Sequence, residues 1–561
     1  MIVPMRHLTL LCVAEESTQA LEALRELGCV HLDLSGAASA AFAAAKGDLE
    51  KAADAVRLVE KAKREAPQPV GANSVRRTVA EIEKLVAARD EALSAADELR
   101  RQVAFYEPYG DFDPALAQSL LDKGIDLSGV CTLPDPLPKA RLSELQNRLA
   151  LAKARADGCT ADLAGTDESW ITAKYPELKE RVAFEAARDT LATQGAVSWI
   201  EGWVSIDNVP RLRAKAVTKA WGILLREAEP GENPPTLIRP PKLFRPVAAL
   251  FEGLGIAPAY SEADVSVPFM CYFSLFFAML VGDGAYGAIV LAATLWGWWK
   301  TKPKEGEGHR PRVVRSWLGL MTVFSSATVL WGILSNTWFG AGIPWCANWP
   351  TVKWLADPSY QNMMFLCFTI GVSHLMIARI WSGLQILNDR TCLAQFGWAG
   401  ILLFMYLVTN AIVGISAGVP TWAYYVFGVS LFLVFGFTLK GHELKSRGIE
   451  LGMLPLNIMS ALGDIISYVR LFAVGLASVK VAENFNSMAT GLLSSEHALW
   501  VNALLAVAMV AILLVGHGLN LAMAGLSILV HAVRLNTLEF SNHKGVSWAG
   551  YAFRPFAKLI K

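Results

Sequence analysis

Long apolar runs fill the chain from about residue 266 to residue 540, and they limit its possible folds more than any other feature. A run of roughly 20 apolar residues is long enough to cross a bilayer as a helix. About eight such runs follow one another, which predicts an α-helical polytopic membrane domain over 266–561. We place its transmembrane helices at 266–282, 284–300, 314–338, 361–383, 393–414, 421–439, 451–490 and 498–540.

The last two runs are much longer than the others. Each continues for about 40 residues without a clear break, which corresponds to about 60 Å of helix, whereas the hydrocarbon core is only about 30 Å thick. We therefore expect the last two helices to be long and tilted. At the other end of the domain, the sequence VGDGAYG at 281–287 joins the first two runs and predicts a tight hairpin.

The basic residues between these runs predict an orientation. Six Lys or Arg occupy 300–315, three occupy 440–447 and four follow residue 541. The alternate loops at 339–360, 415–420 and 491–497 contain one, none and none. Because cytoplasmic loops carry the excess of Lys and Arg, the pattern predicts cytoplasmic N- and C-termini and an even number of spans.

Residues 1–226 have a different composition, rich in Ala, Leu, Glu, Lys and Arg, and their first stretch MIVPMRHLTLLCVAEE lacks the features of a secretory signal peptide. Strands at 7–13 and 29–34 around a helix at 16–27 predict a small α/β lobe in the cytoplasm. Further segments are a returning helix at 139–156, a helix at 176–193, a strand-rich segment at 196–206 and a helix at 208–220. A coiled-coil arm is predicted by apolar residues at spacings of three and four: Val75, Val79, Ile82, Val86, Leu93, Ala96 and Val103.

The charges on the predicted arm fit the solvated face of a coiled coil or a docking surface for a partner protein.

Several classes of function are excluded because the sequence lacks their motifs. No phosphate loop, nucleophile elbow or metal cluster occurs, so we expect no catalytic residues, metal or cofactor in this chain. The net charge is only +1 and neither half of the chain contains a stripe of basic residues, which argues against a nucleic-acid partner. The eight cysteines form no CxxC pair, and the proline-rich stretch 227–246 predicts a linker within 227–265.

Both long runs carry an arginine at lipid depth, beside a stripe of small or polar residues. An arginine there costs about 2.5–3.5 kcal/mol on insertion scales. Its guanidinium stays charged in proteins, and a fixed positive charge lowers the pKa of a nearby carboxyl group. The stripes are Ser460, Gly463, Ser467, Arg470 and Ser478 in the first run, and His517, Asn520, Ala524, Ser527, His531 and Arg534 in the second.

Such a cation is suited to removing a proton from a carboxylate that passes it. The alternative is a structural ion pair with an internal carboxylate such as Asp464 or Glu539. Asp464 lies six residues before Arg470 and faces away from it on a regular helix, which weakens that version of the pairing.

The residues around these arginines resemble one family. GDIISYVRLFAVGLA at 463–477 is similar to the arginine-bearing helix of the membrane stator subunit of V/A-type rotary ATPases, called subunit a in eukaryotes and subunit I in prokaryotes. HGLNLAMAGLSILVHAVRLNTLEF at 517–540, followed by YAFRPF, resembles the last helix and C-terminus of that family. Further similarity extends along the chain in the same order: ELGCVHLD, IEGWV, PPTLIRPPKLFRP, GDGAYG and GVSHL.

The resemblance implies a static, non-catalytic subunit that couples ion flow to rotation. The cytoplasmic part would be a dumbbell that binds peripheral-stalk subunits and the central collar subunit. The membrane domain would abut a ring of proteolipid rotor subunits, with Arg470 and Arg534 between two aqueous half-channels. A compact chain without a long outer loop favours a prokaryotic plasma (inner) membrane. Eukaryotic relatives carry an acidic residue where Ala524 aligns here.

The predicted orientation divides the half-channel candidates into two groups. Asp464, Glu443 and Glu450 are expected toward the cytoplasm, and Ser467 is a further half-channel candidate. The candidates on the other side have structural alternatives: an ion pair with Lys480 for Glu483, a helix cap for Asp283, and hydrogen-bonded core positions for His374 and His531.

Two other classes of protein stay open as alternatives. A secondary transporter with a cytoplasmic regulatory domain would need internal repeats and helices broken near mid-membrane. A membrane scaffold or sensor would explain the coiled coil but not the arginines at lipid depth.

Overall fold

The computed structural model describes residues 2–34, 38–65, 75–123, 134–301, 309–344, 347–355, 360–438, 444–492 and 499–558. The chain divides into two compact units. The arm unit comprises Leu8–Gly202, Pro210–Leu225 and Pro555–Lys561, and the bundle unit comprises Met1–His7, Trp203–Val209 and Arg226–Arg554.

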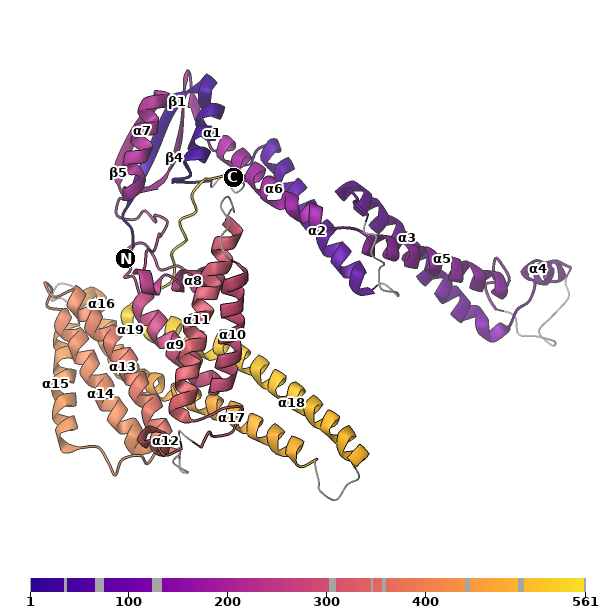
Figure 1. The fold of residues 1–561 in the computed structure, drawn as a ribbon. Helices are drawn as coiled ribbons and strands as arrows, with labels where there is room; N and C mark the ends of the chain where they lie inside the picture. The colour runs from indigo at the N-terminus through magenta and orange to yellow at the C-terminus, as the bar shows by residue number, and fades with distance from the viewer. Residues whose placement is uncertain are drawn as a thin grey trace. The chain divides into compact units, whose positions relative to one another are not determined.

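A small sheet contains the strands of the N-terminal region (Figure 1). Its order is β2 (Val30–Leu32), β4 (Val197–Ser205), β1 (Met5–Val13) and β5 (Gly222–Glu227), and β3 (Ala192–Gln194) pairs antiparallel with β4. Helices α1 (Ser17–Leu27) and α7 (Val209–Lys219) complete the lobe, so the predicted strand–helix–strand opening is confirmed. The strands β3 and β5 were not predicted, and the predicted helix 176–193 ends earlier because β3 takes over.

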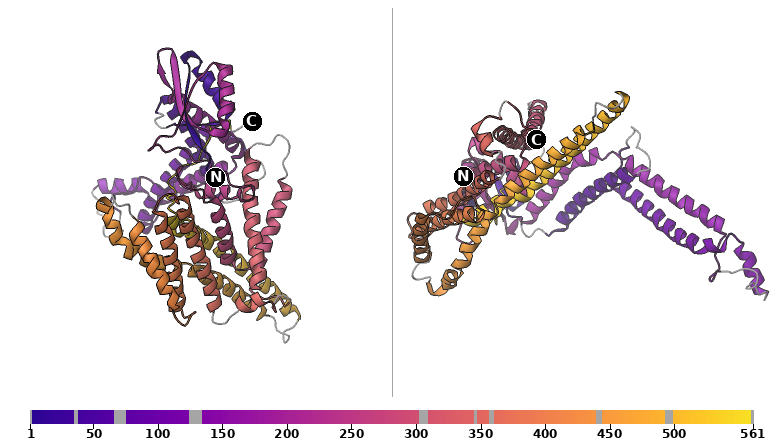
Figure 2. Two further views of the ribbon diagram at one scale, coloured as in Figure 1. Left: turned by 90° about the vertical axis from the view of Figure 1, so that its left-hand side faces the viewer. Right: turned by 90° about the horizontal axis from the view of Figure 1, so that it is seen from below.

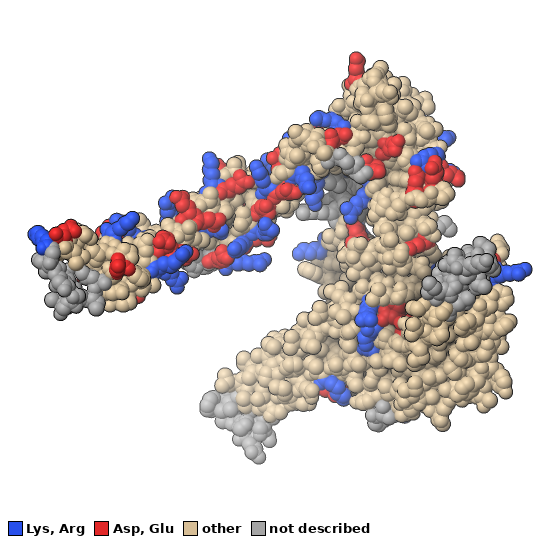
Figure 3. All heavy atoms as spheres, turned by 180° about the vertical axis from the view of Figure 1, so that it is seen from behind, with Lys and Arg blue, Asp and Glu red and all other residues tan. Residues whose placement is uncertain are grey.

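Two pairs of long helices form the rest of the arm unit. Helix α3 (Val79–Tyr106) packs along α5 (Leu142–Ala164), and α2 (Ala40–Glu65) packs along α6 (Ser169–Asp189). Charged side chains cover the helical arm in Figure 3. Helix α4 (Pro114–Asp122) is short and begins at an Asp113 cap.

The buried seam of α3 differs from the predicted one. Ile82 and Ala96 are buried as expected, but Leu93 is 47% exposed and Val75 lies before the helix. Arg89 and Ala92 occupy the buried positions between Ile82 and Ala96 instead. The buried residues of α3 are therefore spaced by seven, three and four positions. The small side chains of Ala92 and Ala96 allow α3 and α5 to approach closely. Helix pairing is observed, while a supercoiled arm stays a prediction.

The bundle unit begins with an irregular segment and a short helix. Residues 228–241 form neither long helix nor long strand, as their prolines predict, and η4 (Lys242–Phe244) and α8 (Val247–Leu254) follow. At the start of this segment Arg226 donates to both carboxylate oxygens of Glu232, and these hydrogen bonds lower the pKa of Glu232 to about 2.

Each predicted apolar run forms helix. In order these are α9 (Ser266–Val281), α10 (Gly284–Lys300), α11 (His309–Ser335), α13 (Gln361–Gln385), α14 (Cys392–Ile412), α15 (Thr421–Phe437), α16 (Leu444–Ile466), α17 (Val469–Thr490) and α18 (Leu499–Ser527). A short helix α12 (Pro350–Leu355) precedes α13. Among the described residues, five segments are long and apolar enough to cross a membrane, and two more apolar helices are shorter. Eight crossings therefore stay a prediction.

The core of the bundle unit is aromatic and aliphatic. Phe269, Phe273 and Phe276 of α9 are buried among Phe324 of α11 and Phe368 of α13. Helices α14 and α15 pack together, and α17 packs against α18 and α9. Figure 2 also shows α17 and α18 side by side. Helices α17 and α18 thus form a pair that packs against the shorter helix α9.

Neither long run is a regular α-helix from end to end. The first is interrupted between Ile466 and Val469, and α16 packs against α14 whereas α17 packs against α18. The second continues from α18 through two π-helical segments, η5 (Ile528–Ala532) and η6 (Leu535–Phe540), to α19 (Ser541–Lys544). The apolar segment Gly452–Thr490 thus continues for 39 residues as expected, but a turn between Ile466 and Val469 divides it into α16 and α17.

Candidate functional site

The interruption between α16 and α17 positions Arg470. Its backbone N–H and its Nε atom both donate to the Ser467 carbonyl oxygen, at 3.3 and 3.0 Å. At this point the ladder shortens, since Leu471 N–H donates to Tyr468 rather than to Ser467. The break therefore frees a carbonyl oxygen that anchors the base of the guanidinium. Ser467, predicted only as a polar lining residue, orients Arg470 through its backbone.

Close packing fixes the break in place. A Cβ atom on Gly371 would lie 2.6 Å from Cγ of Tyr468, so only glycine lets the Tyr468 ring lie against α13. The Tyr468 hydroxyl is 2.8 Å from Nδ1 of His374. His374 is fully buried and stacks between Tyr272 and Phe540, with ring centroids 4.0 and 4.5 Å away. The structure thus places His374 in the packed core beneath the break.

Arg470 and Arg534 meet at one carboxylate. Nη2 of Arg470 donates to Oε1 of Glu539 at 2.7 Å, and Nε of Arg534 lies 3.5 Å from the same oxygen. The Glu539 side chain is 6% exposed, that of Arg470 is 24% exposed and that of Arg534 is 54% exposed. Two guanidinium groups face one carboxylate, which leaves this cluster with one net positive charge.

The π-helical segment explains how Glu539 reaches Arg534. Residues five apart on an α-helix are separated by about 140° around its axis. In η6 the hydrogen bonds run to the fifth residue, so residues five apart come to the same side. Arg534 is the N-cap of η6 and Glu539 is its fifth residue. The sequence offered an ion pair with Asp464 or Glu539 as the alternative role of the arginines. Among the described residues, the structure shows this ion pair with Glu539 and none between either arginine and Asp464.

Asp464 instead belongs to a second cluster, together with residues that were not predicted. Its Oδ2 atom is 3.0 Å from Nε2 of His543. Nε of Arg379 donates to Nδ1 of His543 at 3.0 Å, and Nη1 of Arg379 donates to Gln395. Because Nδ1 accepts from a permanent donor, this imidazole carries its proton on Nε2 and donates it to Asp464. The cluster joins α13, α14, α16 and α19.

A third polar cluster connects α10, α17 and α18. The Tyr286 hydroxyl is 2.7 Å from Nδ1 of His517, whose Nε2 is 3.1 Å from Oδ1 of Asn486. Asn520 donates to the Tyr286 hydroxyl and to the Ser478 carbonyl, and the Ser478 hydroxyl donates to Asn520. The two polar stripes found in the sequence thus contact each other here. Tyr286 has a sequence signal only as part of GDGAYG, and Asn486 has none beyond its polarity.

The other predicted residues have separate positions. Asp283 is 1% exposed and uses both oxygens in the chain: one caps α10 through Ala285 N–H and the other accepts from Gly340 N–H, both at 2.8 Å. Glu483 pairs with Lys480 at 2.7 Å. His531 interacts electrostatically with both arginines, and its Nδ1 atom is buried without a hydrogen-bond partner. Glu443 and the side chain of Glu450 lie outside the described residues.

Comparison with known proteins gives one consistent result. The chain is 37% identical to V-type ATP synthase subunit I of Borreliella burgdorferi over 65% of its own length and 60% of that protein. It is 27% identical to V-type ATP synthase subunit I 1 of Treponema pallidum over 99% of its length and 100% of that protein. A-type ATP synthase subunit I of Methanocaldococcus jannaschii is 26% identical over 75% of this chain and 64% of that protein.

No protein-family model matches the chain. The chain spans less than two thirds of the Borreliella relative and the whole of the Treponema relative. The resemblance inferred from the arginine-bearing segments is confirmed by these relatives, which are named V-type or A-type ATP synthase subunit I. These matches identify the chain as a homologue of the V-type and A-type ATP synthase subunit I proteins.

Proposed function

We propose that this chain is the static membrane subunit of a V/A-type rotary ATPase and couples proton flow to rotation of a proteolipid ring. The observation that carries the proposal is the cluster of Arg470, Arg534 and Glu539. It sets two permanent cations against one carboxylate within apolar helices, and both cations keep exposed surface. The names of the homologues support the same assignment.

The charges of the cluster suggest how it acts. A rotor carboxylate that arrives at the cluster takes up its uncompensated positive charge and forms a charge-assisted hydrogen bond. The positive charge favours the ionised form of that carboxylate, so its proton leaves before it passes. Arginine cannot release a proton of its own, so protons do not cross directly between the two sides. Glu539 holds the guanidinium groups in place between successive rotor subunits.

Two polar clusters are the proposed routes to the arginines. On the cytoplasmic side, Asp464 and His543 form a hydrogen-bonded pair that can exchange protons with water, because Asp464 is 31% exposed. On the other side, the proposed route follows the polar cluster of Ser478, Asn520 and His517 between α17 and α18. His531 lies within electrostatic range of both arginines and is the proposed last group before them.

Two earlier candidates are not placed on these routes. Asp283 has both carboxylate oxygens engaged by backbone N–H groups, and it holds the α9–α10 hairpin. His374 is stacked between two rings in the core. We therefore assign both residues to supporting positions rather than to the proton routes.

The proposal extends to partners and location. The arm unit would bind peripheral-stalk subunits and a central collar subunit, which would hold this chain against the torque of the ring. ATP would be made or hydrolysed on other subunits, so this chain would not be an enzyme by itself. The complex would lie in a prokaryotic plasma membrane with both termini of this chain in the cytoplasm.

A secondary transporter is the second candidate, because the break between α16 and α17 matches the broken helices of such proteins. The homologues favour the rotary ATPase, and one experiment separates the two. In the assembled complex, Arg470→Lys and Arg470→Ala should both abolish ATP-driven proton pumping while all subunits still co-purify. Arg390→Ala, a change at an exposed loop arginine, is the control. Pumping by either Arg470 variant at the rate of the control would refute the mechanism.

A further inference from the structure

A cavity of about 330 Å³ opens between α9, α11, α13 and α17, and none of the three residues of the arginine cluster lines it. Its volume is at the small end of the roughly 300–1,000 Å³ typical of ligand sites. No group that we assign to proton flow lines this cavity, and Glu483, a half-channel candidate from the sequence, is paired with Lys480 there. The cavity therefore needs a separate explanation.

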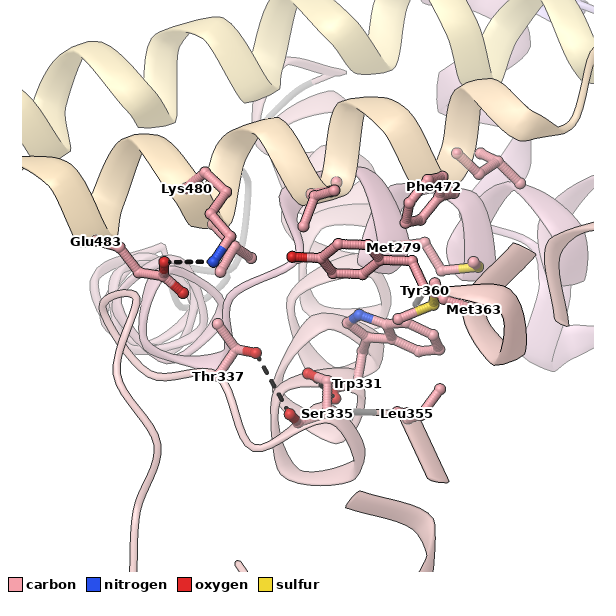
Figure 4. Close-up of a pocket in the computed structure, with 15 residues that line it drawn as sticks. Met279, Trp331, Ser335, Thr337, Leu355, Tyr360, Met363, Phe472, Lys480 and Glu483 are labelled. Atoms are coloured by element: carbon pink, nitrogen blue, oxygen red, sulfur yellow. Dashed lines mark hydrogen bonds and ion pairs between the residues drawn. The ribbon is translucent and has the colours of Figure 1, made fainter. Parts of the chain in front are cut away.

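The two ends of the cavity differ in chemistry. Figure 4 shows Met279, Trp331 and Phe472 at one end and the Lys480–Glu483 pair at the other. The hydroxyl of Tyr360 is directed toward the charged end. Met279 is 3% exposed and Trp331 is 9% exposed, so the apolar end is enclosed, whereas the side chains of Lys480 and Glu483 are 50% and 40% exposed. The site is amphipathic, with its charges at the opening.

The position of the cavity along the helices matches a membrane boundary. Helix α9 ends at Val281, α11 ends at Ser335 and α13 begins at Gln361, and residues beside these three ends line the cavity. By the predicted topology all three ends lie on the same, non-cytoplasmic side. Tyr and Trp are enriched where lipid headgroups begin, and a lysine there extends its ammonium group toward water. The charged end thus lies at the depth of the headgroups, and the enclosed apolar end lies at the depth of the acyl chains.

We propose that this cavity binds one zwitterionic phospholipid with an ethanolamine headgroup, whose acyl chain enters the apolar end. Lys480 and Glu483 supply one positive and one negative charge, which complement the phosphate and the ammonium group of that headgroup. Their mutual contact uses one donor of Lys480 and one oxygen of Glu483, so both keep bonding capacity. Tyr360 adds a hydroxyl donor for the phosphate.

Three common headgroups differ in how well they complement Lys480 and Glu483. A phosphatidylglycerol satisfies Lys480 but offers no cation to Glu483. A phosphatidylcholine offers a cation without N–H groups, so it cannot donate a hydrogen bond to Glu483. The ethanolamine lipid alone among these three satisfies both charges through hydrogen bonds. The cavity volume suits part of one acyl chain, so the rest of the lipid stays in the bilayer.

The test measures lipid retention by the purified full-length chain. Detergent-solubilised protein is incubated with phosphatidylethanolamine, phosphatidylglycerol or phosphatidylcholine, and the lipid-bound fraction is measured by native mass spectrometry. Leu476→Trp fills the cavity and should remove the retained lipid of every class. Ala477→Trp, at the adjacent exposed position outside the cavity lining, should retain lipid as the unmodified chain does.

The charge variants identify the headgroup. Lys480→Gln should weaken retention of both phosphatidylethanolamine and phosphatidylglycerol by about fivefold, which corresponds to roughly 1 kcal/mol. Glu483→Gln should weaken phosphatidylethanolamine alone and so remove its advantage over phosphatidylglycerol. Lys353→Gln is the matched control, since Lys353 is exposed and lies outside the lining.

Three outcomes would overturn the proposal. These are equal retention by the Leu476→Trp and Ala477→Trp variants, equal retention of the three lipids by the unmodified chain, and displacement of all bound lipid by detergent alone. The thermal unfolding midpoint of each lipid-free variant shows whether the chain is folded. Because binding is measured on the single chain, the result is independent of whether Arg470 drives proton pumping.

Discussion

Glu539 accepts a 2.7 Å hydrogen bond from Arg470, although the two residues lie 69 positions apart in the sequence. One belongs to a π-helical segment and the other to the first turn of α17. The same carboxylate oxygen also faces Arg534. One oxygen of Glu539 therefore contacts the arginines of both long apolar runs. The contribution of these contacts to proton pumping can be measured by substitution.

Neutralising Glu539 tests its role as the internal counter-charge. In Glu539→Gln the two guanidinium groups lose their shared anion, and a hydrogen bond to a charged group contributes about 1.5–3 kcal/mol. We expect proton pumping by the assembled complex to fall about tenfold or more, which corresponds to at least roughly 1.4 kcal/mol. Glu252→Gln removes an exposed carboxylate of α8 and should leave pumping unchanged. Equal pumping by the two variants would show that Glu539 is dispensable.

Asp464 should be needed for flux rather than for assembly. In Asp464→Asn an amide oxygen can still accept the proton of His543 Nε2, so the hydrogen bond survives, but the side chain no longer binds and releases a proton. We expect proton flux through reconstituted vesicles to slow while the subunit composition stays the same. Asp207→Asn, which changes a carboxylate paired with Arg239, provides the control. Unchanged flux in Asp464→Asn would remove this residue from the proposed cytoplasmic route.

Gly371 should be intolerant of even one methyl group. A Cβ atom there would lie 2.6 Å from the Tyr468 ring, and overpacking of this kind typically costs about 1–3 kcal/mol. We expect Gly371→Ala to lower the thermal unfolding midpoint of the purified chain. Gly428→Ala on α15 is the matched control, because no atom lies within 4 Å of its added Cβ and alanine favours helix by about 0.5–1 kcal/mol. A midpoint for Gly371→Ala at or above that of Gly428→Ala would contradict the packing argument.

The predicted orientation can be tested on the two loops that flank α14. Leu387 precedes this helix and Ser416 follows it, and both are exposed. In a cysteine-free background, a membrane-impermeant maleimide applied to intact cells should label Ser416→Cys. It should label Leu387→Cys only after the cells are permeabilised. The opposite pattern would invert the topology, and labelling of both from outside would mean that α14 does not cross the membrane.

The sequence by itself determined the chain's division into a charged helical part and an apolar part, the positions of the apolar helices, and the presence of Arg470 and Arg534 within them. These features depend on local composition and on the length of apolar runs, so they need no knowledge of contacts. The resemblance to subunit I rested on the same local segments and is confirmed by the homologues.

Tertiary structure alone decided how the arginines are held. The break at Ser467 and Tyr468 is held by the packing of the Tyr468 ring against Gly371 of α13, and no break-forming residue marks it in the sequence. The π-helical segment that turns Glu539 toward Arg534 has no distinct composition either. The sequence suggested a cytoplasmic position for Asp464 but not its hydrogen-bond partner, because His543 lies 79 residues away in the sequence. Such pairings depend on long-range packing, which brings together side chains that periodicity along one helix cannot relate.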